Sequence, residues 1–245
     1  MTRQLDEAKA DLRRGIYDGA FAAGRPLREQ QVAERLGVSR TLARLAMAEL
    51  ETDGLLVRAP NRGVTVRAFS PEEVRDAIRV RGEIEGVAAR FAAERGLDAE
   101  DRARFQDAMA KGEALLDRDL ADAAARKAWV AMNAAFHAAV LQAARNEALE
   151  AAYQRVAAMP LASPDAILFD ADDLTATRRA LSLAHCDHQR ALTAIEAREG
   201  ERAGWLMREH ARRSAENKLH LLSERSGYRR LSALPGGKLV RPAFG

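Results

Sequence analysis

The chain has 245 residues, of which 47% are apolar and 31% charged, so it is long enough for two domains and apolar enough for a buried core. Aromatic residues make up only 5%, and alanine and leucine, which favour helix, are abundant, so the composition predicts a mostly helical protein. It excludes a membrane-spanning run, a signal peptide and, with Cys186 alone, an intrachain disulfide. We therefore expect a soluble cytoplasmic protein with no membrane partner.

The net charge of +3 is unevenly distributed along the chain. Basic residues exceed acidic ones in residues 1–68 and in the tail from Ser226, whereas acidic residues are in excess between them. Differences this small can arise by chance. They nevertheless place positive charge where a DNA phosphate backbone would need it.

The first 68 residues predict a winged helix-turn-helix DNA-binding domain. Gly37 is a C-terminal glycine at the end of one short helix, and Ser39 is a good N-cap for the next. Two short β-branched runs follow, separated by Ala-Pro-Asn-Arg-Gly, which is typical of a hairpin. The expected elements, in chain order, are helices at 5–23, 28–36 and 39–53 and strands at 55–58 and 64–67.

The third of these helices has the pattern of a recognition helix. Such a helix enters the major groove by its N-terminal end, where arginine can bind guanine with two hydrogen bonds and hydroxyl groups can contact phosphate. The alternative is a solvated helical hairpin with ordinary surface arginines, but the hairpin that follows favours DNA binding. The outward candidates are Ser39, Arg40, Thr41 and Arg44.

From residue 69 onward the pattern predicts an all-helical domain. Ser70, Pro71 and Glu73 form a helix start with a capping box. Breaks in the periodicity divide residues 69–225 into roughly six helices, which we expect to form a bundle for ligand binding and dimerisation. The tail, 226–245, has little periodicity and is rich in glycine and proline, so we expect it to be flexible. The expected breaks are at 96–98, 118–119, 145–146, 160–164 and 199–200.

The N-terminal domain resembles the GntR family of regulators. The likeness rests on LGVSRTLARLAMAELETDGLLVR, which starts at Leu36, and on the wing NRGVTV. The family usually has proline, valine and glutamate where Leu42, Ala43 and Leu45 stand, so this chain keeps the packing face and lacks an acid on the DNA side.

The resemblance implies that Arg40, Thr41 and Arg44 contact the operator and that the wing tip approaches the minor groove. Some relatives use another arginine just before the second helix. Gln30 stands near that position here, and Arg28 is close enough to replace it. The full set of candidate DNA contacts is Arg28, Ser39, Arg40, Thr41, Arg44, Arg62 and Gly63.

The helical domain resembles the FCD sensor domain of the fatty-acid-regulator branch of this family, with a narrower likeness to vanillate repressors. The likeness rests on three strings, RDAIRVRGEIEGVAARFAAERG, MNAAFHAAVLQAARN and HCDHQRALTAIEAREGERAGWLMREH, which cover 75–96, 132–146 and 185–210. It implies a small carboxylate effector, with an aromatic acid as one candidate, and a repressor that the effector releases from DNA.

Four of the five histidines fall in these strings. Three histidines from three helices suit a first-row divalent metal and leave coordination positions open. The resemblance implies His137, His188 and His210 as ligands, with Asn133 in the place of the usual acid, and zinc as the metal. His185 is a candidate partner of a ligand or of the effector. The alternative is that these histidines are ordinary surface or core residues.

Arg81 is a candidate clamp for the effector's carboxylate, since an arginine in a helical cavity can form two charge-assisted bonds. The alternative is an ion pair with Glu85 one turn away. Two other functions stay open: a metal-dependent hydrolase that uses the three histidines, and a structural dimer module that bridges DNA without sensing. No glutamate of the HExxH kind adjoins the histidines, so the first reading is a DNA-binding regulator that is not an enzyme and acts as a homodimer.

Overall fold

The computed structural model describes residues 2–59, 63–167, 169 and 173–243. The chain folds into two compact units, which are described separately. The first, called the DNA-binding unit, comprises the chain up to Val74, Ala158–Leu161 and the part from Leu219 onward. The second, called the sensor unit, comprises Arg75–Ala157 and Ala162–Lys218. In the part of the chain given above, no helix is long and apolar enough to cross a membrane.

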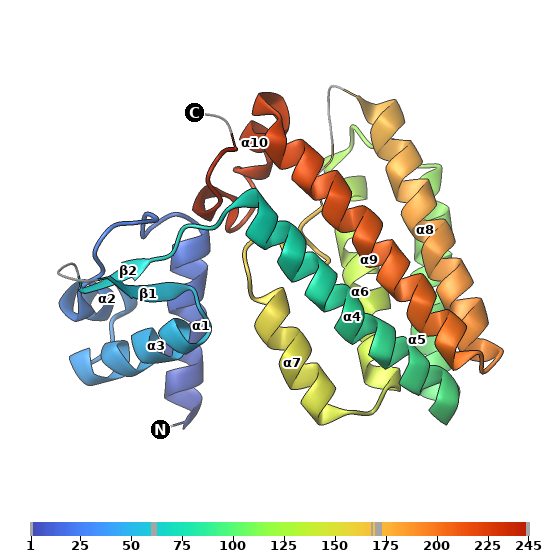
Figure 1. Ribbon diagram of the computed structural model, residues 1–245, viewed down its shortest axis with the longest axis horizontal. Coiled ribbons are helices and arrows are strands. Elements are labelled where there is room, and N and C mark those ends of the chain that lie inside the picture. Colours follow the sequence, from blue (N-terminus) through green and yellow to red (C-terminus); the bar gives the residue numbers. More distant parts are fainter. Residues whose placement is uncertain (1, 60–62, 168, 170–172, 244–245) are drawn as a thin grey trace. The chain divides into compact units, whose positions relative to one another are not determined.

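The DNA-binding unit has the predicted order of three helices and a hairpin (Figure 1). The strands pair antiparallel, with Leu56 opposite Val66, and Leu12, Ile16 and Leu50 are fully buried among the helices. The first helix ends at Tyr17 and not at residue 23, because Gly19 takes a left-handed φ of 80°. The elements are α1 Thr2–Tyr17, α2 Glu29–Leu36, α3 Arg40–Thr52, β1 Leu56–Ala59 and β2 Gly63–Val66.

The sensor unit is an antiparallel helical bundle, so the predicted mostly helical class is confirmed (Figure 1). Helices α4 and α9 lie side by side, and a Cβ at Gly86 would stand only 2.9 Å from the carbonyl oxygen of Gly204. Glycine at these positions therefore permits the close approach of the two backbones. Six long helices are present in the described residues: α4 Pro71–Arg95, α5 Ala99–Leu116, α6 Ala123–Ala143, α7 Glu147–Ala157, α8 Leu174–Glu196 and α9 Gly200–Ser223.

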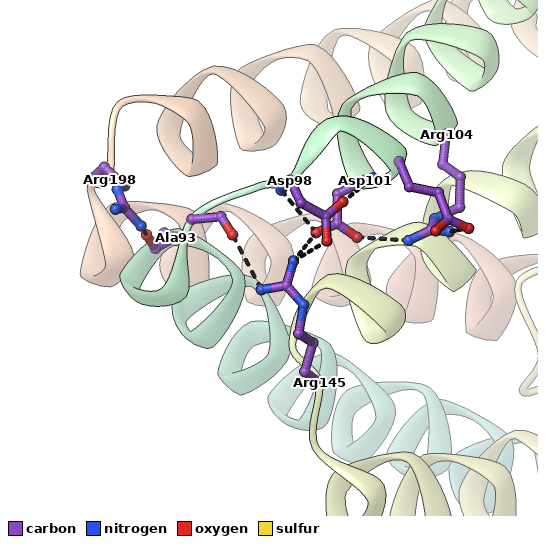
Figure 2. Close-up of polar contacts among 8 residues, drawn as sticks. Ala93, Asp98, Asp101, Arg104, Arg145 and Arg198 are labelled. Atoms are coloured by element: carbon purple, nitrogen blue, oxygen red, sulfur yellow. Dashed lines mark hydrogen bonds and ion pairs between the residues drawn. The ribbon is translucent and has the colours of Figure 1, made fainter.

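Two arginines fasten the turn between α4 and α5 (Figure 2). Arg198 donates to the carbonyl of Ala93 at 3.1 Å and so satisfies the end of α4. Arg145 contacts the carboxylate of Asp98 at 2.6 Å, and Asp98 forms a capping box with Asp101 at the start of α5. These contacts explain why the bundle bends at the predicted breaks near residues 96–98 and 145–146.

The C-terminal tail contains regular secondary structure in its described part, although its sequence shows little periodicity. Its flexibility stays a prediction. The tail forms helix α10 (Arg225–Leu231) and a short 3-10 turn (Gly237–Leu239). Its backbone then pairs with Phe69. The amide of Phe69 donates to the carbonyl of Leu239, and the carbonyl of Phe69 accepts from the amide of Arg241, both at 2.8 Å. The side chains of Leu231, Leu239 and Val240 are buried. A few well-placed apolar residues therefore hold a segment that has no helical periodicity.

Candidate DNA-reading surface and metal centre

The turn between α2 and α3 is built by the two residues that the sequence indicated. Gly37 adopts a left-handed φ of 67°, and its amide donates to the carbonyl of Ala33. The Ser39 hydroxyl accepts from the amide of Leu42 at 3.2 Å and caps the start of α3. This local geometry fixes the direction in which the first turn of α3 points.

The outward face of α3 carries the candidate base-reading side chains. Ser39, Arg40, Thr41 and Arg44 are exposed, whereas Ala43, Ala46, Met47 and Leu50 are buried. The Arg40 guanidinium donates to the side-chain oxygen of Gln30 at 2.9 Å, so α2 contributes to the same surface. Their contacts with DNA stay predictions.

The remaining candidate DNA contacts lie at the start of α2 and on the wing. Arg28 is exposed at the N-cap of α2, where its side chain makes no capping hydrogen bond. Gly63 is exposed, has a φ of 69° and pairs with Ala59 at the end of the hairpin where the chain passes from β1 to β2. Arg62 lies outside the described residues.

Three buried histidines of the sensor unit meet at one point. His137 on α6, His188 on α8 and His210 on α9 each offer a ring nitrogen, and these atoms lie within 4.8 Å of one another. The ring of Phe136 stacks on His188 with centroids 4.1 Å apart and fixes its plane. Among the described residues, Nε2 of His137 and both ring nitrogens of His188 have no hydrogen-bond partner. Buried polar atoms of this kind need a partner that the chain itself does not supply.

Two carboxylates orient these imidazoles from behind. Glu85 on α4 contacts Nδ1 of His137 at 2.7 Å, and Asp187 on α8 contacts Nδ1 of His210 at 3.4 Å. A carboxylate on one ring nitrogen directs the other nitrogen inward, which is the usual support of metal-bound histidine. The sequence missed both acids in this role. Glu85 was considered only as a partner of Arg81, and Asp187 lies unmarked inside the HCDH string.

The charge states also suit a metal. Burial would raise the pKa of Glu85, but the charge of Arg81 and the hydrogen bond with His137 lower it to about 2, so the group is ionised. Burial lowers the pKa of His137, although the charge of Glu85 partly opposes this shift. Burial also lowers the pKa of His188 well below its usual range. Neutral imidazoles with a buried anion behind them are the form that binds a divalent cation. The residues present therefore fit a metal ion.

Arg81 and Asn133 lie in the same unit but make other contacts. Arg81 is 3% exposed, has its Nε 3.5 Å from Glu85 and donates to the carbonyl of Ala162. The ion pair with Glu85 that the sequence suggested is thus present. The Asn133 side-chain amide donates to the carbonyl of Pro164 at 2.8 Å. The roles of both residues toward effector and metal stay predictions.

His185 does not join the other three histidines in the metal-binding group. Its Nε2 lies 3.4 Å from a carboxylate oxygen of Glu113, and its ring meets that of Trp129 edge-on at 6.2 Å. Gly112 on α5 leaves the space that this ring fills, since a Cβ there would clash with it. His185 and His188 therefore lie three residues apart on the same helix, but the ring of His185 does not join the cluster that contains His188.

Comparisons with known proteins agree with this arrangement. Residues 4–66 match the family described as bacterial regulatory proteins, gntR family, and residues 76–213 match the FCD domain. The chain belongs to the GntR family. Its FCD match alone covers more than half of the chain, and the chain is accordingly a DNA-binding transcription regulator with an FCD effector-binding domain.

A curated relative and two solved structures illustrate the likeness. The chain is 28% identical over 200 residues to a probable D-xylose utilization operon transcriptional repressor of Paenarthrobacter nicotinovorans, covering 80% of each chain. E. coli McbR/YncC shares the fold with a TM-score of 0.61 and 22% identity, over 89% of this chain and 97% of that one. A GntR regulator from Rhodococcus sp. RHA1 gives 0.58 and 22%, over 90% and 99%.

These relatives are transcriptional regulators, so the hydrolase alternative gains no support from them. The broad family prediction is confirmed. The narrower likeness to vanillate repressors stays a prediction.

Proposed function

We propose that this regulator is a cytoplasmic homodimeric repressor that binds double-stranded operator DNA and is released by a small carboxylate, with aromatic acids among the candidates. The observation that carries the proposal is the buried cluster of His137, His188 and His210 beside the buried pair Arg81–Glu85. A helical bundle has no structural need for so many buried polar groups, because burying them costs free energy unless each is satisfied. A binding site explains them.

In this proposal a divalent metal, zinc first among the candidates, is held by the three histidines. Asn133 precedes His137 by one helical turn and stands where the family has an acid. When bound, the metal supplies a positive charge and open positions for an acid's oxygen atoms. Glu85 and Asp187 orient the imidazoles, and Arg81 binds the acid with charge-assisted hydrogen bonds.

The homodimer follows from how a recognition helix reads DNA. One helix such as α3 reads only a few base pairs, so specific binding normally uses two half-sites related by the two-fold axis of a dimer. Light scattering at micromolar concentration should give twice the chain mass of 26.8 kDa. A monomer that binds its operator fully would contradict this part of the proposal.

The test is a titration of DNA from upstream of the protein's own gene, with and without benzoate, succinate and a wider set of carboxylic acids. We expect one acid class to weaken binding by about 5- to 150-fold, which is the usual size of a coupling between two sites. Arg81→Ala should abolish this response to the acid. The matched control is Arg79→Ala, whose guanidinium is half-exposed on the same helix 3.6 Å from Glu216. If no acid changes operator affinity, the carboxylate assignment fails.

A further inference from the structure

Three buried side chains of the sensor unit converge on the segment that joins α7 to α8. They come from α4, α6 and α9, and each donates a hydrogen bond to a backbone carbonyl of this segment. The acceptors are alternate residues along the chain. The pairs are Arg81 with Ala162, Asn133 with Pro164 and Lys218 with Ala166. Residues 158–166 are called the strap below.

The three donors are better suited to an anion than to carbonyl groups. Arg81, Asn133 and Lys218 are 3%, 6% and 8% exposed, and the buried guanidinium of Arg81 carries a permanent positive charge. Burial and the charge of Arg81 lower the pKa of Lys218 to about 7, although Asp165 opposes the shift. In a buried site of low dielectric, a carboxylate with its full negative charge attracts a cation more strongly than a neutral carbonyl does. A carboxylate would therefore compete well with the strap for these donors.

The other end of the strap is held in the DNA-binding unit. The hydroxyl of Tyr17, the last residue of α1, donates to the carbonyl of Ala158. Pro160 lies against Gly236, since a Cβ added at Gly236 would come within 3.4 Å of the Cβ of Pro160. One short segment is thus fastened by side chains of the sensor unit at one end and by the DNA-binding unit at the other.

The middle of the strap is strained. Leu161, the last residue before the donor-held end, has a φ of 59°, in the left-handed region that apolar side chains rarely adopt. Such a conformation persists only while its surroundings impose it. Loss of the hydrogen bonds at either end of the strap would therefore let the backbone of Leu161 relax. That relaxation would alter the hydrogen bonds at the other end.

Helix α1 leads from the strap toward the recognition helix. Lys9 and Arg13 on α1 pair with Asp53, the C-cap of α3, at 3.0 and 2.5 Å. Leu12 and Ile16 on the same helix are fully buried in the core of this unit. A change at Tyr17 would thus reach α3 through packed contacts of one unit.

We propose that the strap stands in for the acidic group of the effector and that Lys218 is an effector-binding residue together with Arg81. When a carboxylate takes these donors, it releases the strap from the sensor unit and thereby alters the hold of Tyr17 on its other end. This inference rests on the proposed function for the identity of the effector. The mechanical part does not, because removing a donor by substitution should release the strap in the same way.

Hydrogen exchange of the full-length protein, read at single residues by mass spectrometry, tests the mechanical part. Lys218→Met should speed exchange about tenfold at the far end of the strap, at the amides of Asp18 and Gly236, which donate to the carbonyls of Arg14 and Tyr17. Tyr17→Phe should in turn speed exchange at Ala166 and Ile167, whose amides donate to the carbonyls of Ser163 and Asp165. If each substitution affects only the end that it touches, the strap does not couple the two units and the proposal is overturned.

Two variants serve as matched controls for these substitutions. Lys111→Met removes an exposed lysine paired with Asp107 on α5 and should leave the strap unchanged. Tyr228→Phe removes another hydroxyl–carbonyl bond of the DNA-binding unit, to Val240 at 2.9 Å, and should also leave it unchanged. If the controls loosen the strap equally, the effect is general destabilisation and the proposal fails.

The same measurement with benzoate or succinate separates this inference from the proposed function. An acid that weakens operator binding should also speed exchange across the strap, and Lys218→Met should reduce its affinity about tenfold. If an active acid leaves the strap protected, the stand-in role is wrong while the regulatory proposal stands. If no acid is active but the strap couples its two ends, the carboxylate assignment alone fails.

Discussion

The DNA-binding and sensor units use polar side chains in opposite ways. In the first, Ser39, Arg40 and Arg44 are exposed, and a turn and a cap of the same short stretch set their positions. In the second, His137 and Arg81 are almost fully buried, and they contact Glu85 and the carbonyl of Ala162, each more than fifty residues away in the chain. A surface reader can thus be encoded locally, whereas a buried sensor must be assembled by the whole bundle.

This difference carries an energetic consequence. An exposed arginine costs little when its partner is removed, since water replaces the partner. A buried imidazole or carboxylate that loses its partner keeps its desolvation cost. Substitutions in the sensor unit should therefore have larger effects than substitutions of equal chemistry on α3.

The double substitution His188→Ala and His210→Ala should have the largest effect and tests the role of the buried side chains in the sensor unit. It removes two of the three converging imidazoles, so zinc affinity should fall by roughly 100-fold or more. Zinc titration against a competing chelator measures it, with circular dichroism to verify folding. The matched control is His220→Ala, because His220 also lies on α9 but its side chain is 69% exposed. Unchanged zinc binding in the folded double variant would show that the cluster is not a metal site.

The sequence predicted the parts of the molecule that depend on neighbouring residues. Gly37 and Ser39 are recognisable because a left-handed C-cap and an N-cap are local demands, and both are where the pattern placed them. The order of six sensor helices followed from periodicity and breaks in the same way. The convergence of His137, His188 and His210 came from resemblance to a family and not from spacing.

What the sequence missed depends on tertiary contacts. The Asp187–His210 pair joins two helices, and no periodicity distinguishes Asp187 from a surface acid. Lys218 reads as a surface lysine of an amphipathic helix, yet it is buried against the strap. The pairing of the tail with Phe69 was missed as well, because the two segments are distant in sequence.

Burial of Lys218 should make the folding stability of the protein depend on pH, which an exposed lysine would not do. Its pKa is lowered from 10.5 to about 7 by burial and by Arg81, so between these values the unfolded chain holds a proton that the folded chain lacks. Stability should then rise with pH by about 1 kcal/mol per pH unit over this window and show no such slope below pH 7. The measurement is urea unfolding at pH 6 to 10 on the wild type and on Lys218→Met. If the difference between the two proteins does not vary with pH, burial does not lower the pKa of Lys218.

The smallest expected effect belongs to the surface reader. Arg44→Ala should cost ~1–3 kcal/mol of operator binding and relax the preference at one base pair, because it removes a bidentate arginine–guanine contact without leaving a buried group unsatisfied. Stability should be unchanged, since Arg44 is exposed on α3. The matched control is Arg14→Ala, an exposed arginine of α1 paired with Asp11 at 3.1 Å, which should leave the operator preference unaltered. Equal weakening on all DNA sequences would instead assign Arg44 to a phosphate, and a loss of stability would mean that this face of α3 is structural.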